Sequence, residues 1–377
     1  LKSNYDNFDQ ETGYDKRMVM EETKKSIMNF ISTLLRKYYF FKYNIIPFRF
    51  LFFVRQVNKR LISAIGFKKG FRIIDISLTC ECNFKCEHCS ALIMKKDSPT
   101  LTLDDYKGIV KEAKKMDILS WNLTGGEPLM VDWLEELIPI LEPQRHYIAI
   151  QTNCSLLTEE KAKRLAKLGV NCITTSLDSP VPSEHDNFRK FKDSYKKVLE
   201  GLAHAKKAGM QILVGVTVTH NNLRSQRLVD LIKLINSYGA ICLFNLAVPC
   251  GNWSDNYDII LRGDDREYLK KLMNKYPMTS TDHEVGRNAI GCPAGMEKIY
   301  ITPYGDVIPC PFIHVSFGNI KEQPLSEIVK IMQTKKEFSI YQKVCLAAED
   351  TDFHKKVLSK VNASNLQKPL HYTDIYE

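Results

Sequence analysis

The chain has 377 residues, 44% hydrophobic and 26% charged, a composition typical of a globular protein with one large domain or two ordinary ones. Its eleven cysteines are an odd number spread over a long chain, which excludes a small secreted disulfide scaffold and predicts a reducing, cytoplasmic location. The net charge of +9 comes from 53 basic and 44 acidic residues that are unevenly distributed.

Residues 1–70 are basic and aromatic, and we expect them to form a helical extension. The stretch 23–74 holds twelve Lys or Arg and no Asp or Glu. Lys42, Pro47 and Arg49 interrupt its apolar residues too often for a transmembrane helix. The segment fits either peripheral contact with the inner face of a membrane or packing on the open side of the next domain. No recognised RNA-binding motif is present, which argues against a nucleic-acid partner.

Residues 72–80 (RIIDISLTC) are apolar and β-branched, and predict a buried strand. Directly after it, the sequence CNFKCEHC places Cys82, Cys86 and Cys89 on one short loop. In a reducing compartment, such a cluster indicates a metal site. Zinc would need a fourth ligand, for which His88 is the nearby candidate, so a zinc clip stays an alternative. Three thiolates on a tight loop better suit an iron–sulfur cluster that leaves one iron open.

From residue 72 to 249, predicted strands and helices alternate. The clearest helix has Thr158 as its N-cap and Gly169 at its end. Strands covered by helices on both faces form a parallel sheet, so six such units predict an α/β fold, a partial (β/α)6 barrel. The predicted strands are 72–80, 118–126, 146–153, 171–179, 211–219 and 241–249, and the predicted helices are 102–116, 133–143, 158–169, 194–209 and 227–239.

Unusual residues follow the ends of these strands. The carboxyl ends of parallel strands meet at one edge of a barrel, which we call the rim, so residues far apart in sequence should converge there. After the cysteine loop of the first strand, the rim residues in chain order are Gly125, Gly126, Glu127, Asn153, Ser176, Asp178, Val218 and Cys250.

The succession of CNFKCEHC, TGGEPL and SLDS resembles the radical S-adenosylmethionine (SAM) enzymes. The resemblance covers about residues 72–250, and the combination of motifs is highly specific. His88 stands where the family usually has another aromatic residue before the third cysteine.

This resemblance implies that Cys82, Cys86 and Cys89 hold a [4Fe–4S] cluster whose open iron binds SAM. One electron, from a donor such as flavodoxin or ferredoxin, would split the sulfonium and release a 5′-deoxyadenosyl radical. That radical would abstract hydrogen from an unactivated carbon. The implied SAM-binding residues are Gly125, Gly126 and Glu127 at the methionine amino group, Ser176 and Asp178 at the ribose, Arg189 at the methionine carboxylate, Val218 at adenine, and Asn153 at the same rim.

Simpler interpretations stay open for several of these residues. Ser176 and Asp178 are also common turn formers, and Arg189 lies in a charged stretch that we expect to be a loop, where it could be a solvated surface residue. We expect Cys154, after the third strand, to face the cavity, and consider it as a catalytic thiol. The cysteines expected to be small buried hydrophobes are Cys80, Cys172 and Cys242.

After residue 250 the alternation stops, and 251–377 is predicted to be a smaller α+β domain with a C-terminal tail. A helix over 264–277 leads to two strands, 297–302 and 306–310, around a Pro-Tyr-Gly turn.

Three cysteines mark this domain. The hairpin would bring Cys292 close to Cys310, and Cys345 follows in YQKVCLAAED. The pattern resembles the twitch form of the SPASM-like auxiliary-cluster module, which implies one auxiliary iron–sulfur cluster, of the [4Fe–4S] type, on these three cysteines. Its fourth ligand is Cys250, another side chain or the substrate. Three unrelated buried cysteines are the alternative.

The sequence as a whole predicts a radical SAM enzyme with a core at 71–250 between the extension 1–70 and the cluster domain 251–377. Its expected substrate is a small molecule, a lipid or a lipid-linked sugar at a membrane. Modification of a peptide is an alternative, although 1–70 lacks the strand pattern of a peptide-recognition domain. A non-catalytic iron–sulfur or zinc scaffold at a membrane is the alternative from another class.

Overall fold

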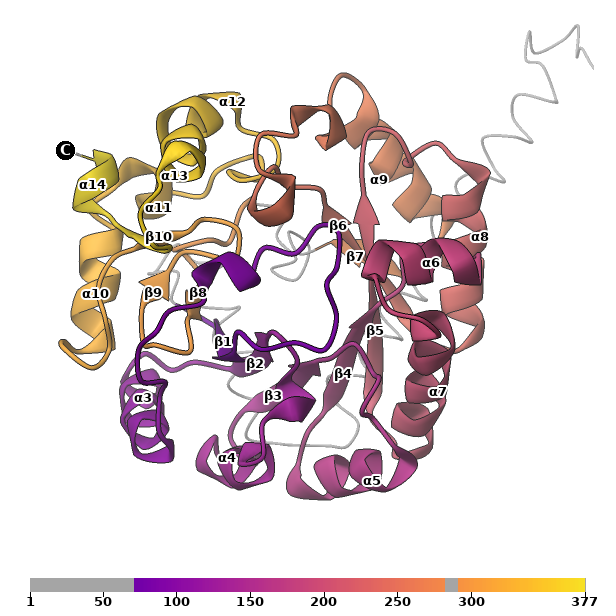
Figure 1. Cartoon of the computed structure of the whole chain (residues 1–377), viewed down its shortest axis with the longest axis horizontal. Coiled ribbons are helices and arrows are strands. Elements are labelled where there is room, and N and C mark those ends of the chain that lie inside the picture. The colour runs from indigo at the N-terminus through magenta and orange to yellow at the C-terminus, as the bar shows by residue number, and fades with distance from the viewer. Residues whose placement is uncertain (1–70, 282–290, 377) are drawn as a thin grey trace, which may run out of the picture.

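The six predicted strands form a parallel sheet in their order along the chain, which confirms the expected α/β architecture (Figure 1). The computed structural model describes residues 71–281 and 291–376. The predicted extension 1–70 therefore lies outside the described residues. The strands are β1 (Ile73–Thr79), β2 (Ser120–Gly125), β3 (Tyr147–Gln151), β4 (Cys172–Ser176), β5 (Gln211–Val218) and β6 (Ile241–Leu246).

Helices follow the strands and lie around the outside of the curved sheet (Figure 1). The predicted caps of α5 are confirmed: the Thr158 hydroxyl accepts from the Lys161 amide, and Gly169 has a φ of 105°. The helices of the core are α3 (Leu103–Lys115), α4 (Leu134–Ile140), α5 (Glu159–Leu168), α6 (Pro182–Arg189), α7 (Ser194–Lys207) and α8 (Gln226–Ser237).

Three further strands extend the sheet at its two ends. Next to β6 lies β7 (Thr279–Thr281), and next to β1 lies β8 (Lys298–Ile301), both parallel to their neighbours. The predicted hairpin is confirmed, because β9 (Val307–Ile308) pairs antiparallel with β8. The sheet therefore continues past the domain boundary predicted at residue 250, and the hairpin of the C-terminal part is built onto the first barrel strand.

Most of the rest of the C-terminal part packs beside this hairpin, whereas α9 (Asp265–Lys275) lies at the other end of the sheet, near β7 (Figure 1). A short parallel pair joins β10 (Val315–Ser316) to β11 (Leu370–His371). The remaining elements are α10 (Leu325–Met332), α11 (Lys336–Ser339), α12 (Thr351–Phe353), the π-helical turn η6 (His354–Leu358), α13 (Ser359–Ala363) and α14 (Thr373–Tyr376).

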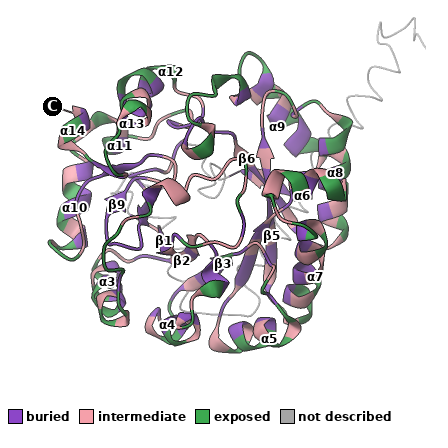
Figure 2. Cartoon of the chain, in the orientation of Figure 1, coloured by how far each residue is buried: buried purple, intermediate pink, exposed green. Residues whose placement is uncertain are grey.

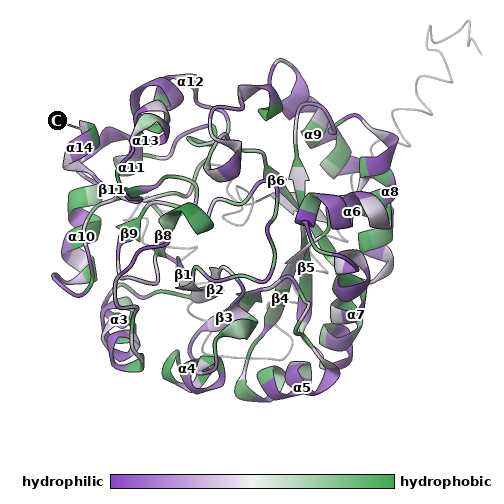
Figure 3. Cartoon of the chain, in the orientation of Figure 1, coloured by the Kyte–Doolittle hydropathy of each residue, from purple (hydrophilic) through white to green (hydrophobic). Residues whose placement is uncertain are grey.

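The hydrophobic core runs between the sheet and its helices. Ile74, Trp121 and Ile150 on neighbouring strands have no exposed surface. Figure 2 shows the strands mainly as buried, and Figure 3 shows apolar and polar residues alternating around the outer helices, as expected for helices with one face on a sheet. Among the described residues, no helix is both long and apolar enough to cross a bilayer.

A buried ion pair holds β8 to β1. The Lys298 ammonium lies 2.9 Å from the Asp75 carboxylate, and both side chains are at most 15% exposed. Asp75 also accepts a hydrogen bond of 2.8 Å from the Asn122 amide. Because a buried charge that loses its partner remains desolvated, this pair fixes where the hairpin joins the barrel.

Substituting Lys298→Met should therefore lower the free energy of unfolding by about 3 kcal/mol, since it leaves the Asp75 carboxylate without its cation. The measurement is the urea midpoint of the purified anaerobic protein. Lys107→Met is the control, because its pair with Asp104 is exposed and should contribute little. Equal midpoints for both variants would contradict the assignment.

Candidate functional site

The cysteine loop, residues 80–90, leaves the rim end of β1 and is anchored by one aromatic ring. Phe84 is buried, and its ring stacks on Phe191 with centroids 4.2 Å apart. Around this anchor, Cys82, Cys86 and Cys89 are partly exposed. Burial raises the pKa of Cys82 to about 11, so binding a metal would release its proton.

Two glycines at the end of β2 pack directly on this loop. The Gly126 amide donates to the Thr79 carbonyl (2.7 Å), and the Glu127 amide donates to the Glu81 carbonyl (2.8 Å). A Cβ on Gly126 would lie 1.9 Å from the Glu81 oxygen, and one on Gly125 would lie 2.4 Å from the Thr79 oxygen. Close contact with the cysteine loop therefore requires glycine at positions 125 and 126. The family resemblance implies another reason for these glycines, an approach to the methionine amino group of SAM.

The Glu127 carboxylate is buried and joins the ends of β2 and β3. One oxygen accepts from the Leu129 amide (3.0 Å) and the Thr152 hydroxyl (2.6 Å), and the other accepts from the Asn153 amide (2.8 Å). Burial raises the pKa of Glu127, and these hydrogen bonds act in the opposite direction. Glu127 therefore holds the turn that carries the glycines.

Asn153 extends this connection to the first cysteine. Its side-chain amide donates to Asn83 Oδ1 (2.8 Å) and lies 3.9 Å from Cys82 Sγ. Asn83 in turn donates to the Ser155 hydroxyl (2.8 Å). A donor beside a thiolate stabilises its negative charge, so Asn153 suits a cluster ligand at Cys82.

A charge pair supports the second cysteine. Arg189 Nε donates to Asp178 Oδ2 at 2.7 Å, while Arg189 Nη1 lies 3.7 Å from Cys86 Sγ. Burial acts to raise the pKa of Asp178, but the Arg189 charge and a hydrogen bond from His185 hold it well below its usual range. The loop expected around Arg189 is wrong, because this residue ends helix α6. Its side chain is only 12% exposed, which rules out the alternative role as a solvated surface residue.

The third cysteine is held by the segment after β6, which includes the short turn η3 (Gly251–Trp253). Asn252 donates through its amide N–H to the Cys89 carbonyl and through its side chain to the Cys86 carbonyl, both at 3.0 Å. A Cβ on Gly251 would lie 2.3 Å from the Cys89 oxygen. This contact was not predicted, although a glycine directly after the last rim cysteine was a signal of the same kind as Gly125 and Gly126.

His88 lies between two aromatic rings at this junction. It stacks on Phe188 with centroids 4.8 Å apart, and Trp253 lies 5.5 Å away. Burial lowers the pKa of His88 to about 4, and the Arg189 charge adds to this effect. Its buried Nδ1 has no hydrogen-bond partner among the described residues. The ring therefore packs as a neutral aromatic residue, as the family pattern implies for this position.

The other predicted rim residues differ in accessibility. Ser176 is partly exposed at the end of β4, and Gly215 on the next strand leaves space for the Asn245 side chain beside it. Val218 at the end of β5 has no exposed surface. A ribose contact at Ser176 is thus open to a ligand, whereas the adenine contact at Val218 stays a prediction.

Cys154 does not face the cavity, so that expectation is wrong. The residue is 2% exposed and packs in the core against α7, where a Cβ on Gly201 would lie 2.7 Å from its sulfur. Burial raises the pKa of its thiol to about 12. A protonated, inaccessible thiol is a poor nucleophile, so Cys154 is a packing residue. The expected burial of three other cysteines is confirmed, namely of Cys80, Cys172 and Cys242.

The C-terminal cysteines lie close together, because the Cys292 amide donates to the Gln342 carbonyl (2.8 Å), three residues before Cys345. Cys292 and Cys345 are in side-chain contact, and this contact, followed by burial, raises the pKa of Cys345. Cys310 also raises the pKa of Cys345, and burial, followed by Cys292, raises the pKa of Cys310. Burial raises the pKa of Cys250, and Cys310 and Cys89 act in the same direction, so Cys250 lies near one cysteine of each group.

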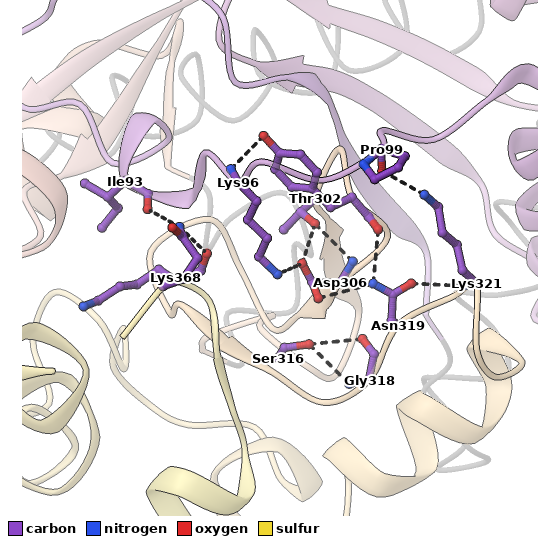
Figure 4. Close-up of polar contacts among 12 residues, drawn as sticks. Ile93, Lys96, Pro99, Thr302, Asp306, Ser316, Gly318, Asn319, Lys321 and Lys368 are labelled. Atoms are coloured by element: carbon purple, nitrogen blue, oxygen red, sulfur yellow. Dashed lines mark hydrogen bonds and ion pairs between the residues drawn. The ribbon is translucent and has the colours of Figure 1, made fainter. Parts of the chain in front are cut away.

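Polar contacts join the two cysteine groups through residues 91–101 (Figure 4). The Lys96 ammonium lies 2.7 Å from the Asp306 carboxylate in the hairpin turn, with both side chains largely buried. The Lys96 amide donates to the Tyr304 hydroxyl (2.9 Å), and the Lys321 ammonium donates to the Pro99 carbonyl (2.9 Å). These residues are more than 200 positions apart in the sequence, and no local signal connects them.

The residues present fit iron–sulfur clusters. Within the described part of the chain, no three His, Cys, Asp or Glu side chains converge on a single metal ion. A multi-iron cluster instead binds each thiolate at a different iron, so its ligands are spread more widely. The thiols of Cys82, Cys86 and Cys89 share one loop and can each bind a different iron. The Asn153 amide near Cys82 and Arg189 near Cys86 would stabilise the negative charge of the thiolates.

Two family models match this chain. The Radical SAM superfamily model matches residues 76–235, and the SPASM model, an iron–sulfur cluster-binding domain, matches residues 292–352.

This chain is a radical SAM enzyme with a SPASM domain.

Two curated proteins are similar to this chain in sequence, and a solved structure is similar to it in fold. The AdoMet-dependent heme synthase of Nitratidesulfovibrio vulgaris is 24% identical over 316 residues, covering 75% of this chain and 85% of that protein. The mycofactocin maturase MftC of Mycolicibacterium smegmatis is 29% identical over 260 residues, covering 64% of this chain and 66% of that protein. The structure of Streptococcus suis SuiB bound to SAM has a TM-score of 0.58 at 15% identity, covering 74% of this chain and 69% of that one.

The cofactors of this radical SAM enzyme are a [4Fe–4S] cluster, SAM and an auxiliary iron–sulfur cluster.

Replacing Cys154 tests its reassignment. Cys154→Ala should leave iron content and SAM cleavage unchanged within about twofold, because the thiol touches neither site, and should cost about 1 kcal/mol of stability through lost packing. Iron analysis, a 5′-deoxyadenosine assay and thermal unfolding are the measurements. Loss of SAM cleavage with intact iron content would restore Cys154 as a catalytic residue.

Proposed function

We propose that this enzyme splits SAM reductively and abstracts hydrogen from an unactivated carbon of a small molecule. The observation that carries the proposal is the cysteine loop, which is clamped between Gly125–Gly126 on one side and Gly251–Asn252 on the other. When bound, the cluster and SAM supply a one-electron cleavage that yields methionine and a 5′-deoxyadenosyl radical, which becomes 5′-deoxyadenosine on taking the hydrogen.

The proposed role of the chain is to hold and orient. Cys82, Cys86 and Cys89 would bind three irons of the SAM cluster. Arg189, fixed by Asp178, would keep positive charge beside Cys86 and the methionine carboxylate.

Other rim residues would position the rest of SAM. Ser176 would contact the ribose from its partly exposed position. Glu127 would act by holding the turn that carries Gly125 and Gly126. Asn153 would act through its side-chain amide, which lies beside the Cys82 sulfur. Val218 would lie behind the adenine.

The second cysteine group would serve the substrate. Cys292, Cys310 and Cys345 would hold the auxiliary cluster, with the fourth position left to Cys250 or to substrate. This cluster would accept an electron from the substrate radical, which would make the net reaction an oxidation.

The relatives support two kinds of substrate. A small molecule is favoured because the match to the heme synthase spans most of both chains. Peptide modification is the second candidate, favoured by the similarity to a mycofactocin maturase. A lipid or lipid-linked substrate rests on residues 1–70 alone, which lie outside the described residues.

Cysteine variants test the SAM-cleavage function. After anaerobic reconstitution, the triple variant Cys82→Ala, Cys86→Ala, Cys89→Ala should form no 5′-deoxyadenosine above the enzyme-free level while keeping auxiliary-cluster iron. Cys292→Ala should lose that iron but retain the SAM cluster. Cys172→Ala is the control, because this thiol is buried on β4 away from both groups. Wild-type protein that cleaves no SAM, or that binds zinc at the triad, would contradict the proposal.

Liposome flotation tests the extension. If the twelve basic residues between 23 and 74 bind anionic lipid, the full chain should float with anionic vesicles more strongly than a version lacking residues 1–70. Neutral vesicles are the control. Equal flotation of both proteins would remove the membrane hypothesis.

A further inference from the structure

The last 24 described residues lie beyond the matched SPASM segment but are firmly attached to it. The Leu370 amide donates to the His314 carbonyl (3.0 Å), and the Tyr372 amide donates to the Ser316 carbonyl (2.9 Å). The Tyr372 ring stacks on buried Phe317 with centroids 5.4 Å apart. This C-terminal segment is therefore a fixed part of the fold.

Part of this segment, residues 362–368, crosses to the barrel and contacts the loops that hold the SAM-cluster cysteines. The Asn362 side chain donates to the Pro249 carbonyl at 3.1 Å, directly before Cys250. The Gln367 side chain donates to the Ile93 carbonyl at 3.3 Å, four residues after Cys89. Figure 4 shows Ile93 and Lys368 side by side at this crossing.

A pocket of about 330 Å³ lies where these segments meet. No carboxylate lines it, and Ile93 and Leu366 supply its apolar surface. Asp255, which is not among the lining residues, accepts from the Asn362 side chain at 3.4 Å. This volume is at the lower end of the range for ligand pockets, about 300–1,000 Å³, so it suits one arm of a substrate rather than a whole cofactor.

Two polar groups in the pocket are available to a ligand. Lys368 donates to the Ser364 and Leu366 carbonyls but forms no ion pair with any described residue. Asn365 has no hydrogen-bond partner in the described part of the chain, and its side chain is exposed. The positive charge of Lys368 also affects a buried neighbour. Burial lowers the pKa of His314 to about 4, and the Lys368 charge acts in the same direction.

We propose that this pocket binds a carboxylate of the substrate, with Lys368 supplying the charge and Asn365 an amide N–H. A half-buried lysine without an acidic partner can form a charge-assisted contact with an anion, and the neighbouring apolar surface suits the carbon chain that carries it. The inference deepens the proposed function, because the loops around the pocket continue directly into Cys89 and Cys250. The substrate carbon would then lie toward the cysteine loop.

Binding probes can distinguish the possible sources of the carboxylate. One probe is a fluorescent hexaglutamate peptide, with hexaglutamine as its uncharged match. The other is a porphyrin with four carboxylate side chains, with its methyl ester as the match. Affinities are measured anaerobically with the reconstituted full chain. At least one acidic probe should bind more tightly than its match, and the probe that does so identifies the substrate as peptide-like or as a small polycarboxylate.

Matched lysine variants assign the binding to the pocket. Lys368→Gln should weaken the acidic probe about tenfold, the loss of one charge-assisted contact. Lys368→Arg should restore affinity to within about threefold. Lys356→Gln, which removes the same charge from an exposed position of the same segment, should have no effect.

The outcomes separate this inference from the proposed function. Equal binding of the acidic and uncharged probes, or equal losses for Lys368→Gln and Lys356→Gln, would overturn it. Substrate-independent formation of 5′-deoxyadenosine should be unchanged in Lys368→Gln, because the pocket touches no cluster ligand. A wild-type protein without any SAM cleavage would instead overturn the proposed function, while the binding result would stand.

Discussion

The site depends on the close approach of two backbones. The turn after β2 can reach the cysteine loop only because Gly125 and Gly126 have no side chains, and two amide–carbonyl hydrogen bonds then join the segments. A buried carboxylate at Glu127 fixes the same turn from the other side, so the position of the loop is set by atoms of the sheet itself. Groups that must hold a reactive cofactor need this kind of rigid support.

The same principle is repeated at the other end of the loop. Gly251 lets the segment after β6 lie against the Cys89 carbonyl, and Asn252 binds the loop at two carbonyls. Between these two contacts, Arg189 provides the positive charge nearest to Cys86. The loop is thus held by residues that follow β2 and β6, which are separated in the sheet by β3, β4 and β5, and the curvature of the sheet brings them together (Figure 1).

Much of the barrel was predictable because its segments are short, apolar and regularly spaced, and local caps such as Thr158 and Gly169 act within one helix. The cysteine triad was recognisable from its spacing together with the TGGEPL and SLDS motifs that follow it. The loop expected around Arg189 and the cavity-facing position expected for Cys154 were wrong because both environments are set by tertiary packing. Arg189 ends α6 and points inward, and Gly201 on α7 leaves space for the Cys154 sulfur. The addition of β8 to β1 was also missed, because pairing between distant strands leaves no mark in either segment.

The ion pair between Lys96 and Asp306 has a consequence for how such enzymes can be rebuilt. One partner follows the SAM-cluster loop, and the other begins the turn that leads to Cys310. A chimera that joins this barrel to another cluster module would bury one of these charges opposite an unmatched residue. The two iron-binding halves of the chain are therefore exchangeable only when positions 96 and 306 are transplanted as a set.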